Sequence, residues 1–219
     1  DLKALSNLGK AYFDSGDLKR ADLVLRKGMA IDRNYLPIQR HFVDLFIQKR
    51  EYDKAERMVK DIMKFHSESA AEHSALGSIF EKKGQLSDAR KHIDKALEID
   101  PAFPHARINL ATLEQHHGKN EEAKKIYESL LTDDQENSDL RNNLANLYLT
   151  EGRYGEGWSN YEYRWKVSPL VNAVWPIKGK DTWDGEKDKD VVLWREQGIG
   201  DDILFLGLTP EARDRSRRL

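Results

Sequence analysis

The chain has 219 residues, of which 39% are hydrophobic and 34% are charged. This balance is too apolar for a disordered chain and rich in charge for a compact sphere, so it favours an extended helical array with a large wet surface. The 36 lysine and arginine residues nearly balance the 38 aspartate and glutamate residues, and a net charge of -2 gives no general attraction to nucleic acid. The absence of cysteine excludes disulfides, thiolate metal ligands and cysteine nucleophiles.

No apolar run approaches the roughly 18 residues of a membrane span, and the start of the chain lacks the pattern of a signal peptide. We therefore expect no membrane association, and a cytoplasmic location fits the composition. The chain begins at Asp1 rather than at a methionine, which indicates a fragment or a processed form.

A period of 34 residues repeats through most of the chain. Repeat units that align without insertion begin at Leu2, Leu36, Ala70, Pro104 and Ser138. In the second half of each unit one position always holds a small residue, namely Ala21, Ala55, Ala89, Ala123 or Gly157. A small residue in register suits a place where two helix backbones approach closely.

Each unit predicts a hairpin of two helices. A large apolar residue recurs early in the unit, and an aromatic residue follows four positions later in all units but one, where Glu114 stands instead. The early position holds Leu8, Phe42, Leu76, Leu110 and Leu144. A glycine, which favours a left-handed turn, ends the first helix in four units, at Gly16, Gly84, Gly118 and Gly152. Arg50 takes this place in the second unit, which we therefore expect to be the least stable.

These residues resemble the tetratricopeptide repeat family over about residues 2–169. The resemblance implies an all-α fold, a solenoid of about five stacked hairpins over residues 1–169, in which the first helices line a concave groove. It also implies that this groove binds a protein or a peptide.

Amide and other polar side chains occupy the two positions of each first helix that would face such a groove. An asparagine side chain both donates and accepts hydrogen bonds, so a row of them can hold the backbone of an extended peptide. The stretch resembles the superhelix of O-linked N-acetylglucosamine transferase in this placement, although solvated asparagines explain the row equally well. The candidate peptide-binding residues are Asn7, Lys10, His41, Asp44, Asn109, Thr112, Asn143 and Asn146.

No cofactor or metal site is predicted in this chain. None of the seven histidines has the spacing of a zinc protease, and the adjacent His116 and His117 point in different directions on a helix. No basic stripe with interleaved aromatic residues is present, so a nucleic-acid partner is not expected.

All five tryptophans lie at or after residue 158, which marks a boundary in composition. Trp158, Tyr161 and Trp165 have the spacing of one wide aromatic face on a helix. This face either caps the solenoid or is a docking seat for a following domain.

Residues 170–188 have the composition of a linker, and residues 189–219 look like the incomplete start of a Rossmann-like domain. The run Asp190–Trp194 predicts a buried strand, and a turn with Gly198 and Gly200 precedes an apolar helix. The exposed amides at such a helix start are a candidate site for phosphate or another anionic substrate group.

The tail and the last repeat together resemble bacterial proteins that fuse tetratricopeptide repeats to a glycosyltransferase domain. In that resemblance Asp201 is the candidate general base, and a nucleotide sugar would be the substrate of the parent protein. The alternative is that Asp201 only caps the following helix. Because most of such a domain is missing, we expect this chain alone to have no transferase activity.

Three functional hypotheses follow. The first is a binding module, the acceptor-recognition arm of a larger protein. The second is that the parent is a glycosyltransferase of which this chain is a catalytically incomplete fragment. The third is a scaffold that self-associates through its tryptophan-rich tail.

Overall fold

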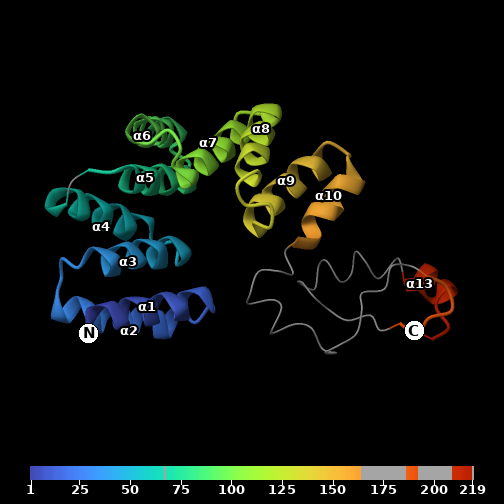
Figure 1. Cartoon of the computed structure of the whole chain (residues 1–219), viewed down its shortest axis with the longest axis horizontal. Helices are drawn as coiled ribbons and strands as arrows, with labels where there is room; N and C mark the ends of the chain where they lie inside the picture. Colours follow the sequence, from blue (N-terminus) through green and yellow to red (C-terminus); the bar gives the residue numbers. More distant parts are fainter. Residues whose placement is uncertain (67, 164–185, 192–208, 219) are drawn as a thin grey trace. The chain divides into compact units, whose positions relative to one another are not determined.

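The computed structural model describes residues 1–66, 68–163, 186–191 and 209–218. The chain divides into two compact units, Asp1–Pro169 and Leu170–Leu219. In the first unit the helices follow one another in chain order, each pair stacked on the next (Figure 1). The predicted solenoid of helical hairpins is therefore confirmed.

Each first helix of a pair begins at the residue that begins a repeat unit. The five pairs are α1 Leu2–Asp14 with α2 Leu18–Ile31, α3 Leu36–Gln48 with α4 Tyr52–Phe65, α5 Ala70–Lys82 with α6 Leu86–Ile99, α7 Pro104–His116 with α8 Asn120–Leu131, and α9 Ser138–Thr150 with α10 Tyr154–Tyr161. In the first four pairs, the second helix also contacts the first helix of the next pair, as α2 contacts α3. These contacts between neighbouring pairs make the hydrophobic core continuous from one repeat to the next.

Small residues let the two helices of a hairpin approach. Ala21, Ala55, Ala89 and Ala123 are fully buried. At Gly77 an added Cβ would lie 2.7 Å from Ile93 Cγ1, closer than side chains pack. Ile93 in turn packs with Leu113 of the next hairpin, so one close contact supports the junction between two repeats.

The turn inside each hairpin uses a left-handed residue. Four of these residues are glycines with φ between 74° and 78°. In the second repeat Arg50 adopts φ 58° at the same place, a conformation that costs a non-glycine residue about 1–2 kcal/mol. The backbone there still closes in the same way, because the amide of Glu51 donates to the carbonyl of Phe46 at 2.8 Å.

Glu114, the exception in the apolar stripe, is buried but not isolated. Its carboxylate lies 2.7 Å from an Arg90 guanidinium nitrogen and 3.1 Å from Lys119 Nζ. Burial raises the pKa of this carboxyl, but hydrogen bonds and charge from Lys119 and Arg90 outweigh it and hold the pKa below its usual range. A carboxylate with two cations can thus replace an aromatic residue in the stripe.

The second unit has few described residues. Helix α13 spans Thr209–Arg215, and Asp190 makes one isolated bridge to Arg218, with the Val191 amide donating to the Arg218 carbonyl at 2.8 Å. The described residues of this unit contain no β-ladder, because a single bridge does not extend into one. The predicted strand–helix start of an α/β domain is therefore not supported. Trp165, Gly198, Gly200 and Asp201 lie outside the described residues.

Among the described residues, no helix combines the length and the apolar character that crossing a membrane requires.

Candidate functional site

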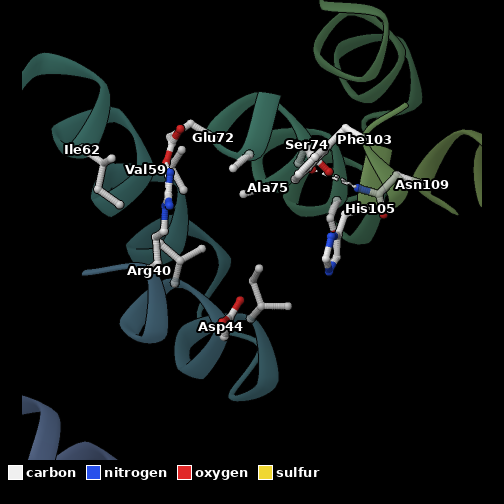
Figure 2. A pocket seen from close by; sticks show the side chains of 14 residues that line it. Arg40, Asp44, Val59, Ile62, Glu72, Ser74, Ala75, Phe103, His105 and Asn109 are labelled. Carbon is white, nitrogen blue, oxygen red and sulfur yellow. Dashed lines mark hydrogen bonds and ion pairs between the residues drawn. The ribbon is translucent and has the colours of Figure 1, made fainter. Parts of the chain in front are cut away.

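A pocket of about 320 Å³ opens on the face formed by the first helices α3, α5 and α7 (Figure 2). We call it the central pocket. Small side chains on α5, Ala71, Ala75 and Ser78, line it and leave the space open. Its volume is that of a small ligand-binding pocket, large enough for one or two side chains of a partner.

The floor of the central pocket is aliphatic. Val43 and Ile47 reach it from α3, and Val59 and Ile62 reach it from α4. Val59 and Ile62 are almost completely buried, so they are fixed by the core beneath. The floor is a rigid apolar surface, of which Ile47 stays partly exposed and would gain from covering by another apolar side chain.

Arg40 and Glu72 form an ion pair at one side of the pocket. The Arg40 Nε and Nη2 atoms both donate to Glu72 Oε1, at 2.9 and 2.7 Å, and the Ser69 hydroxyl donates to Glu72 Oε2. The Glu72 side chain is 3% exposed and lies in the first turn of α5, where a helix favours negative charge. This carboxylate is fully engaged by its own protein.

Asp44 lies in another part of the same pocket and has no hydrogen bond or ion pair with any described residue. It is open to solvent, but the concave surroundings desolvate it, and this desolvation raises the pKa of its carboxyl. Lys10 on α1 and His105 on α7 oppose that rise without reversing it. Figure 2 shows Asp44 and His105 at the open rim of the pocket, with Arg40 turned away toward Glu72.

Asn109, a predicted peptide-binding residue, also lines the pocket but is already bonded. Its Nδ2 donates to the backbone carbonyl of Ser74 at 3.0 Å and to the Ser74 hydroxyl at 3.1 Å. Thr112 is likewise engaged, since its hydroxyl donates to the Ile108 carbonyl and lies 3.1 Å from the Tyr127 hydroxyl. These two polar groups tie helices together, and the amide oxygen of Asn109 is left as an acceptor.

The other predicted groove residues lie outside the central pocket. Lys10 Nζ pairs with Asp14 at 2.8 Å. His41 is half-buried, and burial, aided by the charge of Lys10, lowers its pKa. No hydrogen bond to a described residue is made by the side chains of Asn7, Asn143 and Asn146.

Three residues that shape the pocket were missed in the sequence. Arg40, Phe103 and His105 occupy other positions of the repeat than the two that define the expected groove. Phe103 and His105 lie with ring centroids 5.5 Å apart, which fixes one wall. Pro104, the first residue of α7, lies between the two in the sequence.

The predicted docking face is partly described. Trp158 and Tyr161 on α10 pack edge to face at 5.6 Å, and Trp158 is 47% exposed. Tyr154, one turn earlier, is 64% exposed. An aromatic surface therefore ends the described part of the array.

The side chains of His73 and His92 lie against each other. The Nδ1 atoms of His73 and His92 are 3.0 Å apart, and His73 Nε2 lies 2.9 Å from a Glu68 oxygen. The described residues hold no group of three or more histidine, aspartate or glutamate side chains arranged to bind a metal ion.

Residues 2–35 and residues 82–135 match family models described as tetratricopeptide repeat. The chain contains tetratricopeptide repeats. The two matched segments correspond to the first hairpin and to the region from the end of α5 to the end of α8.

The tetratricopeptide array is similar to known proteins over about three quarters of the chain. Protein FlbA of Caulobacter vibrioides is 26% identical over 163 residues, which are 72% of this chain and 27% of FlbA. The chain thus spans about a quarter of the length of this relative.

Two solved structures share the fold. The thermophilic tetratricopeptide repeat protein TTC0263 of Thermus thermophilus aligns with a TM-score of 0.66 at 15% identity, covering 77% of this chain and 92% of that one. The pilF protein of Pseudomonas aeruginosa aligns with a TM-score of 0.56 at 20% identity, covering 74% of each chain. At these identities the likeness concerns the fold alone.

Proposed function

We propose that the tetratricopeptide array is a binding module that holds a peptide or a protein segment over the central pocket. The observation that carries this proposal is an open pocket with an aliphatic floor and one carboxylate, Asp44, that lacks a partner among the described residues. A concave apolar lining with a few polar groups is the usual composition of a recognition site.

The pocket differs from the ladder of amides that the sequence suggests. Asn109 is bonded to Ser74, so it has an acceptor but no free donor for a peptide backbone. We therefore propose that the main contact is made by a side chain of the ligand on the aliphatic floor. Asn7 and Asn143 would add hydrogen bonds to the ligand backbone.

A binding test uses the full chain and a random peptide library. The variant Ala75→Phe places a ring in the central pocket, whereas Ala11→Phe adds the same ring to an exposed position on α1. We expect the wild-type chain and Ala11→Phe to enrich the same peptides, and Ala75→Phe to bind them at least about tenfold more weakly. Equal binding by a folded Ala75→Phe chain, with helicity and melting temperature retained, would sink the proposal.

The array is also proposed to serve a larger protein as its acceptor-recognition arm. The support is that the aligned region makes up only 27% of FlbA, and that the tail resembles the start of a glycosyltransferase domain in its sequence. In that case a nucleotide sugar is a substrate of the parent and not of this chain. The alternative of self-assembly has its support in the exposed Tyr154 and Trp158, and sedimentation analysis of a Trp158→Ser variant tests it.

A further inference from the structure

We propose that the central pocket selects an extended peptide in which a lysine or arginine lies two residues from an aliphatic residue. This inference rests on the proposed function and names the ligand chemistry of the same pocket. Asp44 binds the cation, and the aliphatic floor binds the neighbouring side chain.

The charges of the pocket point to a cationic ligand. Arg40 already donates two hydrogen bonds to Glu72, and Lys10 is paired with Asp14, so the positive charges near the pocket are balanced by the protein itself. Asp44 has no such partner among the described residues. The pocket therefore offers one uncompensated negative charge to its ligand.

Desolvation of the Asp44 carboxylate favours a cationic ligand over a neutral or acidic one. The concave surroundings already remove part of the water from the Asp44 carboxylate, which is why its pKa is raised. Lys10, Asp14 and His105 act on this group through their charge, but none of them forms an ion pair with it. An ammonium or guanidinium from a ligand would compensate the carboxylate, whereas an acidic side chain would be repelled and a neutral one would leave it unpaired.

The spacing follows from the helix that carries both groups. Asp44 and Ile47 are three residues apart on α3, which places neighbouring side chains on one face about 5–6 Å apart at Cβ. An extended peptide advances about 3.3 Å per residue. Successive side chains of an extended peptide point to opposite faces, so the cationic and aliphatic side chains of the ligand must be two residues apart to reach the pocket together.

Peptide selection with the full chain tests the inference. The variants are Asp44→Asn, which removes the charge, Asp44→Lys, which reverses it, and Asp88→Asn, a matched loss of charge on the exposed face of α6. We expect wild type and Asp88→Asn to enrich lysine or arginine two residues from leucine, isoleucine or valine. Asp44→Asn should keep only the aliphatic preference, and Asp44→Lys should enrich aspartate or glutamate instead.

Affinity measurements with one enriched peptide complete the test. Replacing its cationic residue with norleucine, which is uncharged and of similar length, should weaken binding to wild type about tenfold and change binding to Asp44→Asn by less than about twofold. If enriched peptides bind in an Ala75-dependent way without a preference for lysine or arginine, or if the preference survives in Asp44→Asn, the inference is wrong and the proposed function stands. If no enriched peptide loses affinity in Ala75→Phe, both are wrong.

Discussion

Glu72 and Asp44 line different parts of the central pocket, and the protein treats them in opposite ways. Glu72 is buried and receives hydrogen bonds from Arg40 and Ser69. Asp44 is exposed and has no partner among the described residues, although its surroundings disfavour its charge. One carboxylate thus belongs to the fold, while the other is free to bind the ligand that we propose, at some cost in stability.

The difference arises from where each residue lies in its helix. Glu72 is in the first turn of α5, where it faces both the helix N-terminus and the preceding repeat. Asp44 lies two turns into α3, on the side that faces the pocket, and small residues of α5 stand opposite it. A carboxylate is therefore paired within the fold at Glu72 in the third repeat, whereas at Asp44 in the second repeat it has no partner among the described residues.

The largest expected effect is on the free energy of unfolding, when Glu72 loses its partner Arg40. Arg40→Met keeps an unbranched apolar stem but removes the guanidinium and leaves a buried carboxylate with only the Ser69 hydroxyl, so we expect a loss of about 2–3 kcal/mol in the free energy of unfolding. Urea denaturation followed by circular dichroism measures it.

The control for this prediction is Arg57→Met on α4. Arg57 is an arginine with no ion pair among the described residues, and its replacement should change stability by less than about 0.5 kcal/mol. Equal effects of the two substitutions would show that Glu72 does not depend on Arg40.

The register of the fold was predictable because it repeats. A small buried residue recurs at the place of Ala89 in every hairpin, so one packing constraint is visible several times in a single sequence. Arg50 also followed from the alignment, since its left-handed turn is that of the glycines in the other repeats. The tail has no such repetition, and its predicted strand was not supported.

The site was less predictable because it depends on contacts between repeats. Asn109 was identified by its position, but its bond to Ser74 comes from the preceding hairpin, 35 residues away. Arg40 and Glu72 are 32 residues apart, and neither position repeats its residue type in the other units. Asp44 was predicted as a groove residue, but its lack of a partner is visible only when the neighbouring helices are in place.

A smaller effect of opposite sign is expected at Asp44. Asp44→Asn removes a charge that the surroundings disfavour, without removing any hydrogen bond to a described residue. We expect the free energy of unfolding at pH 7 to rise by up to about 0.5 kcal/mol, while affinity for cationic peptides falls. A clear loss of stability in urea denaturation would mean that Asp44 supports the fold, as Glu72 does.

The smallest effect is the pH dependence of that gain. Because the pKa of Asp44 is raised in the folded chain, the folded state binds more protons than the unfolded state between the ordinary aspartate pKa, about 4, and the raised value. Wild type therefore loses stability from this group as pH rises through that window, and Asp44→Asn does not. Urea midpoints measured from pH 7 to pH 4 should show the advantage of the variant shrinking toward zero as the carboxyl becomes protonated. An advantage that stays constant on acidification would show that the fold does not disfavour the Asp44 charge, and one that grows would place this carboxylate among the stabilised charges of the fold.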